Sequence, residues 1–320
     1  MVGKSFRKIL PPSLILSSNF IGNLGSSILD GILSSSSQIS ELAQPTAREG
    51  SAPAKSTLVP ETIIACVHKR ESATALKHKY ARHAIVQVFA NENVRGVHQG
   101  NIIILAVEPR AYPSVLAEPG MRSALAGKTL VSIVGGLTPK VLHRTIYGDE
   151  PSTAREKHDH CRIVRALPNT ATAIREGMTL IIDDEEYKYT TETLELICSL
   201  FGALGQARLW PAAKAPIGAT LSACSPAFFT YLLEAVVDAG VGLGLDRVEA
   251  LEMATAGMRG AAGLLASGED SGEVKRKIAT KGGSTEAGLK ALEEGNARKV
   301  VEQAVKTCAQ VASGLGDQEL

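Results

Sequence analysis

The chain has 320 residues, of which 44% are hydrophobic and 21% are charged, and its formal net charge is +1. This composition is typical of a globular protein with room for two domains, and it excludes a fibrous or largely disordered chain. The basic residues are spread along the sequence, so the chain lacks the concentrated positive face that nucleic acids and membrane surfaces require. We therefore expect small molecules and further copies of the chain as its partners.

The five cysteines are far apart and form no Cys-x-x-Cys pair, so the sequence indicates neither a disulfide framework nor a zinc site. No stretch approaches the ~20 uninterrupted apolar residues of a membrane-spanning helix, so we expect no membrane span. Both features favour a cytoplasmic protein. Lys4, Arg7 and Lys8 precede the first acid, Asp30, as in some targeting segments, but a basic tail before the first strand is the preferred interpretation.

The first predicted element is a turn between a strand and a helix, with the sequence FIGNLG. In a dinucleotide-binding fold this turn reads Gly-x-Gly-x-x-Gly, and the pyrophosphate binds at the helix N-terminus. Gly22 and Gly25 match the second and third glycines, while Phe20 stands at the first. Alternatively, Gly22 is the first glycine and two residues are deleted before Asn23. We predict a phosphate-binding loop over Gly22, Asn23, Leu24 and Gly25, with an ordinary turn as the alternative.

Up to about residue 210, short β-branched runs alternate with stretches of helical length. Apolar runs without polar alternation are typical of strands buried on both faces of a parallel sheet, and their spacing indicates βαβ units. The predicted strands are Thr62–Val67, Asn101–Val107, Thr129–Val134 and Arg162–Leu167. Before the first of these strands, residues 34–60 are rich in Ser, Ala and Pro and predict a surface insertion.

The predicted strand that ends at Val67 is followed by His68, Lys69 and Arg70. A cofactor with a free ribose hydroxyl requires an Asp or Glu at this point, whereas a 2′-phosphate requires cationic donors. If a dinucleotide binds, the sequence therefore favours NADPH over NADH. A basic surface turn is the alternative interpretation.

A polar stretch at residues 148–160 contains His158 and His160 among several acids. Histidines with nearby carboxylates are potential metal ligands. A solvated loop is the preferred interpretation here, and we predict no metal site.

After Pro211 the sequence is helical almost throughout, and we predict a boundary between domains at residues 1–212 and 213–320. The stretch Ala227–Val241 is apolar nearly all the way round, so a helix formed by it must be buried on several sides. A helical region of ~105 residues offers little interior of its own, so we expect this helix to pack against a second copy of the chain.

A second helix N-terminus follows Lys281, where two glycines precede Ser284, Thr285 and an acid. Its free amides are able to bind a carboxylate, and the Thr285 hydroxyl is able to hydrogen-bond a ligand nitrogen; plain helix capping is the alternative. All seven histidines lie at or before His160, so no Ser-His-Asp or Cys-His arrangement forms in this region. Hydride addition to an already protonated imine requires no such catalytic arrangement, because the cofactor supplies the chemistry.

Together these features resemble the pyrroline-5-carboxylate reductase family. The resemblance is strongest in Leu221–Phe229, which is similar to the segment that opens the family's dimerisation helix, and it continues through Asp238–Val241. Thr280–Gly295 contains the family's Gly-Gly-x-Thr core, and Leu167–Thr170 resembles its Pro-Asn-Thr loop beside the nicotinamide.

The resemblance implies an α/β fold, in which a Rossmann-type doubly wound parallel sheet is followed by an all-helical dimerisation domain. That domain interleaves with its twin, often within a ring of dimers. The implied activity is reduction of the cyclic imine 1-pyrroline-5-carboxylate to L-proline, the last step of proline biosynthesis, with NADPH or NADH as hydride donor and no metal.

The resemblance also assigns site residues by position, with Thr285 beside the ring nitrogen as the catalytic residue. The implied substrate-binding residues are Thr280, Gly282, Gly283, Ser284, Thr285 and Ser222. The implied cofactor-binding residues are Gly22, Asn23, Leu24, Gly25, His68, Lys69, Arg70, Ala106, Val107, Pro109 and Asn169.

The chain departs from the family at several positions. Glu108 stands where the family carries a lysine near the cofactor, and this anion weakens phosphate binding unless it points away or pairs with Arg110. Cys224 and Ser225 stand where serine and glycine are usual.

Three alternatives to proline synthesis follow. One is a relative that reduces a six-membered cyclic imine to pipecolate, or a methylated pyrroline. Another is a non-catalytic binding partner that kept the helical dimer and lost its cofactor site. The third is a β-hydroxyacid dehydrogenase, in which Lys281 or Lys290 would be the catalytic acid.

Overall fold

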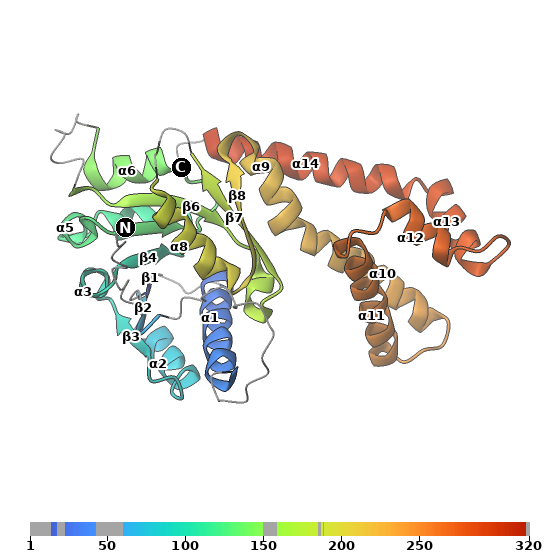
Figure 1. The fold of residues 1–320 in the computed structure, drawn as a ribbon, viewed down its shortest axis with the longest axis horizontal. Coiled ribbons are helices and arrows are strands. Elements are labelled where there is room, and N and C mark those ends of the chain that lie inside the picture. The colour runs from blue at the N-terminus through green and yellow to red at the C-terminus, as the bar shows by residue number, and fades with distance from the viewer. Residues whose placement is uncertain are drawn as a thin grey trace, which may run out of the picture. The chain divides into compact units, whose positions relative to one another are not determined.

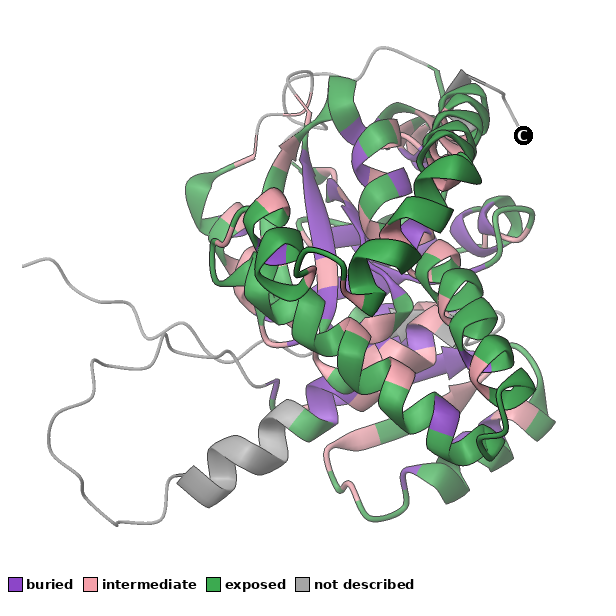
Figure 2. Ribbon diagram, turned by 90° about the vertical axis from the view of Figure 1, so that its right-hand side faces the viewer, coloured by how far each residue is buried: buried purple, intermediate pink, exposed green. Residues whose placement is uncertain are grey.

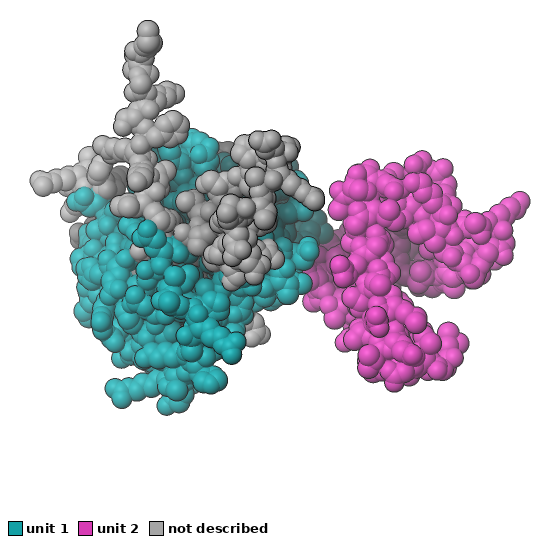
Figure 3. Space-filling model, turned by 60° about the horizontal axis from the view of Figure 1, so that its bottom comes forward, with its two compact units in different colours: residues 1–223, 312–320 teal, residues 224–311 magenta. Residues whose placement is uncertain are grey.

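The computed structural model describes residues 14–17, 23–42, 60–149, 159–184, 187 and 189–317, with side chains in the first helix given for residues 24–34. Gly22 of the predicted glycine loop and His158 lie outside these residues. The chain divides into two compact units, residues 1–223 with 312–320 and residues 224–311 (Figure 3).

The first unit is built on an eight-stranded sheet in the order β3-β2-β1-β4-β5-β6-β7-β8 (Figure 1). The strands are β1 (Leu14–Ser17), β2 (Ile63–Val67), β3 (Val86–Ala90), β4 (Ile102–Leu105), β5 (Thr129–Ser132), β6 (Arg162–Leu167), β7 (Gly177–Asp183) and β8 (Gly205–Pro211). All neighbouring pairs are parallel except β6 and β7, so the expected Rossmann-type sheet is confirmed and carries one antiparallel step. The four predicted strands correspond to β2, β4, β5 and β6.

Helices cover both faces of this sheet (Figure 1). Successive residues of β2 face opposite layers, because Ile63, Ala65 and Val67 belong to one core whereas Ile64 and Cys66 belong to the other. The first core includes residues of α1 (Asn23–Leu42), α2 (Arg70–Lys79) and α8 (Thr191–Gly202). The second includes residues of α3 (Asn93–Gln99), α4 (Tyr112–Leu116), α5 (Met121–Leu125) and α6 (Pro139–Tyr147).

The helix α1 lies close to the chain segment that follows β6. A Cβ atom on Gly31 would meet the carbonyl oxygen of Thr172, in the 3₁₀ helix η1 (Thr170–Ile174), and would lie 2.8 Å from Cδ2 of Leu204. Only glycine allows this approach. Because α1 continues to Leu42, the first part of the predicted insertion at residues 34–60 is helical.

A continuous helical run leads out of the sheet after β8. It comprises η2 (Ala212–Lys214), α9 (Ala215–Ala219), the π-helix η3 (Thr220–Cys224) and α10 (Ser225–Gly242). Among the described residues, this run alone is long and apolar enough to cross a membrane by length and composition, with 17% of its most apolar window buried. Core helices of soluble proteins also meet these criteria, so they do not establish a membrane span.

The second unit consists of helices throughout its described residues. After α10 come α11 (Arg247–Ala266), α12 (Ser271–Ile278), α13 (Ser284–Glu294) and α14 (Ala297–Asp317). The helix α11 begins with a capping box, in which the Glu249 carboxylate accepts from Asp246 N–H at 3.4 Å. The Asp246 carboxylate also accepts from Val248 N–H at 2.7 Å. Figure 2 shows buried strands in purple and many exposed helices in green. Helix α10 carries exposed apolar side chains, among them Phe229 and Tyr231, which are 53% and 73% exposed.

Candidate active site

The sheet of the first unit has the strand order of nucleotide-binding folds. The strands β1, β2, β4, β5 and β6 are parallel, so the loops that follow them share one edge. The strand order reverses between β1 and β4, because β1 pairs with β2 on one side and with β4 on the other. Dinucleotides bind at this switch point, outside the carboxyl ends of the strands.

The turn after β2 carries the predicted cationic residues. His68, Lys69 and Arg70 are all exposed, and Arg70 begins α2. Lys69 takes the N-cap position in extended backbone without a side-chain capping bond. Three basic side chains therefore stand at the point where the ribose of a bound dinucleotide lies in this fold.

The segment after β4 stays buried for two residues and then reaches the surface. Ala106 and Val107 are buried, and Glu108, Pro109 and Arg110 are exposed. The carbonyl of Glu108 accepts a hydrogen bond from Ala111 N–H at 2.9 Å. Within the described part of the chain, Glu108 forms no ion pair with Arg110, so its exposed carboxylate is not neutralised by the neighbour expected from the sequence.

The loop after β5 belongs to the same edge and was missed by the sequence reasoning. Gly135 and Gly136 follow buried Val134, and Gly136 has a φ of 78°. A Cβ on Gly135 would meet nothing within 4 Å, so this backbone borders open space. Two glycines directly after an apolar strand were the available signal.

Asn169 joins the end of β6 to the π-helix. Its side-chain N–H donates to the carbonyl of Ser222 at 2.8 Å, and its own carbonyl accepts from the Thr172 hydroxyl at 2.9 Å. The bond to Ser222 fixes the orientation of the amide, and it leaves Asn169 Oδ1 buried without a hydrogen-bond partner among the described residues. A buried acceptor without a partner is costly, so this oxygen suits a ligand that brings an N–H donor.

The π-helix places Ser222 next to this loop. The Ser222 hydroxyl donates to the carbonyl of Gly218 at 2.9 Å within the helical run. Single π-helical turns are frequent at functional sites.

In the second unit, burial and the nearby Cys308 thiol raise the pKa of Cys224, which keeps its thiol protonated near neutral pH.

The predicted carboxylate-binding turn lies in the second unit, directly before α13. Thr280, Gly282, Ser284 and Thr285 are exposed, and Gly283 is the N-cap residue without a side-chain capping bond. Gly282 has a φ of 74°, which favours glycine. The first turn of α13 therefore presents backbone amides to solvent.

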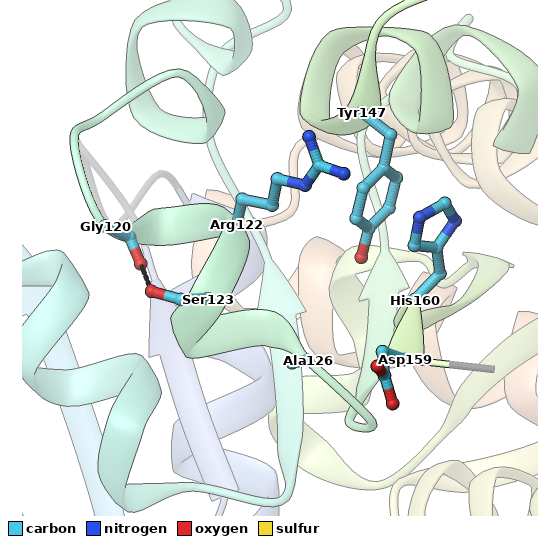
Figure 4. Close-up of a pocket in the computed structure, with 7 residues that line it drawn as sticks. All are labelled: Gly120, Arg122, Ser123, Ala126, Tyr147, Asp159 and His160. Carbon is cyan, nitrogen blue, oxygen red and sulfur yellow. Dashed lines mark hydrogen bonds between the residues drawn. The ribbon is translucent and has the colours of Figure 1, made fainter. Parts of the chain in front are cut away.

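A separate cavity of about 420 Å³ lies at the opposite edge of the sheet, just before β5 and β6 begin (Figure 4). Its lining includes Arg122, Tyr147 and His160, whose side chains lie next to one another. The His160 ring stacks on Tyr147 with centroids 3.6 Å apart, and its Nδ1 lies 3.0 Å from Nε2 of His143. His160 therefore packs against α6, which corrects the expectation of a solvated loop at this position.

The residues at this edge of the sheet fit a nicotinamide dinucleotide. The buried Asn169 Oδ1 lacks a donor, the Gly135 backbone is open, and cationic side chains follow β2. The reversal of strand order is also in place. Fold and site together define a Rossmann-type oxidoreductase that uses NAD(P)H.

Comparison with known proteins narrows this class. Residues 21–136 match the family described as NADP oxidoreductase, coenzyme F420-dependent, and residues 213–315 match pyrroline-5-carboxylate reductase dimerisation. The chain is 37% identical over 296 residues to a pyrroline-5-carboxylate reductase of Lophium arboricola, covering 92% of this chain and 91% of that protein. A Neurospora crassa pyrroline-5-carboxylate reductase is 36% identical over 312 residues, with 92% and 91% covered. The chain belongs to the pyrroline-5-carboxylate reductase family.

Solved structures agree on the fold. Plasmodium falciparum pyrroline carboxylate reductase with NADP bound has a TM-score of 0.73 at 21% identity, covering 96% of this chain and 98% of that chain. The Coxiella burnetii pyrroline-5-carboxylate reductase has a TM-score of 0.72 at 21% identity, with 97% and 100% covered.

Proposed function

We propose that the protein reduces 1-pyrroline-5-carboxylate to L-proline with NADPH, the last step of proline biosynthesis. Family membership supports the reaction. The cofactor supplies a hydride to the carbon of the C=N bond, and the nitrogen carries a proton that is already on the imine or is drawn from water. The double bond becomes CH–NH, so the protein has to orient two rings rather than supply a strong acid or base.

The buried, unpartnered oxygen of Asn169 is the observation that carries the cofactor part of this proposal. We propose that it accepts from the carboxamide of the nicotinamide. His68, Lys69 and Arg70 bind the 2′-phosphate, which favours NADPH over NADH. The start of α1 and the loop Gly22–Gly25 would hold the pyrophosphate, and Ala106, Val107 and Pro109 would contribute to the same cofactor site.

The substrate carboxylate binds at the turn before α13. Backbone amides at a helix N-terminus favour an anion both by hydrogen bonding and through the helix dipole. The Thr280 hydroxyl and the segment Gly282–Thr285 contribute, and the Thr285 hydroxyl lies near the ring nitrogen. The family resemblance also nominates Ser222, in the first unit, as a substrate-binding residue.

We further propose that the protein is a cytoplasmic homodimer that assembles through α10, with a ring of dimers as its larger form. The exposed apolar side chains of α10 and the match to the family's dimerisation region support the homodimer. All five cysteines are free, which supports a reducing compartment. Light scattering on the purified protein tests the assembly, and a monomer at micromolar concentration would contradict it.

A steady-state comparison of imines tests the proposed reaction. NADPH oxidation is followed with 1-pyrroline-5-carboxylate, with its six-membered homologue and with a methylated pyrroline. We expect the highest kcat/KM for the five-membered, unmethylated ring. A large preference for either other imine would replace the proline assignment. Failure to bind NADPH at millimolar concentration would refute the reductase proposal and favour the non-catalytic alternative.

A further inference from the structure

The turn before α13 is held in one shape by contacts within the second unit. The N–H of Gly283 donates to the carbonyl of Thr280 at 2.9 Å. A Cβ on Gly283 would lie 2.7 Å from the Thr280 hydroxyl oxygen, so the threonine side chain packs directly on the glycine backbone. Gly282 adopts the left-handed conformation with a φ of 74°. These contacts fix the direction in which the chain enters α13.

Glu286 supplies one further contact to this turn. Its carboxylate reaches back by four residues and accepts from the N–H of Gly282 at 2.6 Å. A hydrogen bond to an ionised acceptor is roughly twice as strong as a neutral one. In a capping box, the acid at this helical position accepts from the N–H of the N-cap residue. Here the N-cap residue is Gly283, and Glu286 instead accepts from Gly282, the residue before it.

A count of backbone donors shows which amides remain for a ligand. Gly282 donates to Glu286, and Gly283 donates to Thr280. The first helical bond of α13 runs from Ala287 N–H to the carbonyl of Gly283 at 3.2 Å. The three amides between these, those of Ser284, Thr285 and Glu286, are the unsatisfied first-turn donors of the helix. They suit the two oxygens of a carboxylate, whereas the Gly283 amide, which the sequence also nominates, is already used.

The Glu286 carboxylate also brings charge to this position. It lies on the exposed first turn of the helix, where a bound substrate carboxylate would be a second anion. Two like charges on one exposed turn repel weakly in water, by an amount that corresponds to about a threefold loss of affinity. Glu286 therefore has two separable effects, a hydrogen bond that shapes the turn and a charge that opposes the ligand.

We propose that Glu286 is a positioning residue, which presets the Ser284 and Thr285 amides for the substrate carboxylate by holding Gly282 in its left-handed conformation. This inference rests on the proposed function, because it assigns the anion to the carboxylate of the imine. The hydrogen bond of Glu286 goes to the backbone of the turn, so the proposed role concerns substrate affinity rather than hydride transfer.

Two variants separate the hydrogen bond from the charge. Glu286→Ala removes both, and we expect KM for 1-pyrroline-5-carboxylate to rise about tenfold, with kcat and KM for NADPH changed less than twofold. Glu286→Gln keeps an acceptor of the same shape and loses the charge, so its KM should be equal to that of the unmodified protein or up to about threefold lower. Glu294→Ala, on the same helix, removes only an exposed ion pair with Lys290 and should leave all three parameters unchanged.

Hydrogen exchange at the Gly282 amide gives a readout that does not depend on turnover. We expect protection to fall in Glu286→Ala and to persist in Glu286→Gln, with equal thermal unfolding showing that both variants fold. An unchanged KM in Glu286→Ala, or a tenfold rise in Glu286→Gln, would overturn the positioning role. Failure of the unmodified protein to reduce the imine would refute the proposed function instead, and unchanged Gly282 protection in Glu286→Ala would then refute the preset turn.

Discussion

Replacing Asn169 by alanine tests whether this side chain both joins two segments of the first unit and completes the cofactor site. Asn169 is only 8% exposed, and the hydrogen bond from its side-chain N–H to the Ser222 carbonyl is 2.8 Å long. Removing it leaves that carbonyl short of a donor, which costs about 1–3 kcal/mol. For a unit of this size we expect the melting temperature to fall by roughly 2–4 °C per kcal/mol, about 5 °C in total.

The same substitution removes the acceptor proposed for the nicotinamide carboxamide. Loss of one neutral hydrogen bond is worth about 1 kcal/mol, which corresponds to roughly fivefold weaker NADPH binding. Thermal unfolding and calorimetric titration measure the two effects on the same sample. The matched control is Asn101→Ala, because that side chain is exposed at the start of β4. If both variants melt and bind NADPH alike, the assignment of Asn169 is wrong.

Gly31→Ala places a Cβ against the Thr172 carbonyl and should destabilise the protein by about 1–3 kcal/mol. The control Gly202→Ala places a Cβ in open space and should not destabilise it. Equal melting temperatures of the two variants would contradict the packing of α1. Arg70→Ala should raise KM for NADPH about tenfold and leave KM for NADH within about twofold. An equal change in both KM values would refute the proposal that this turn binds the 2′-phosphate. Burial raises the pKa of Cys66 from 9.0 to about 12, so the folded thiol keeps its proton where the unfolded thiol loses it. Urea unfolding should therefore show stability falling as the pH rises from about 9 towards 12, less steeply in Cys66→Ala; equal slopes would contradict this.

The sequence predicts the strands that are buried on both faces. β2, β4 and β5 are buried at every position, so their apolar runs are continuous. β3 and β8 are the edge strands, and their mixed burial leaves short, irregular patterns that resemble loops. The serine-rich end of α1 also lacks an apolar stripe, although the helix continues to Leu42.

The sequence also indicates those candidate site residues that directly follow a predicted strand, such as Arg70 and Asn169. It does not indicate Gly31, because the need for glycine there comes from the Thr172 carbonyl, which is far away along the chain. Likewise, the reach of Glu286 back to Gly282 depends on the left-handed backbone of the turn, which no propensity reports. Contacts of this kind arise from tertiary geometry rather than from residue type.

Transfer of deuterium from labelled NADPH tests the central claim most directly. The protein is incubated with NADPH that carries deuterium in the transferable position and with 1-pyrroline-5-carboxylate, and the product is analysed by mass spectrometry and NMR. We predict L-proline with one deuterium on the carbon that was double-bonded to nitrogen. Proline without the label, or no consumption of NADPH, would contradict the account.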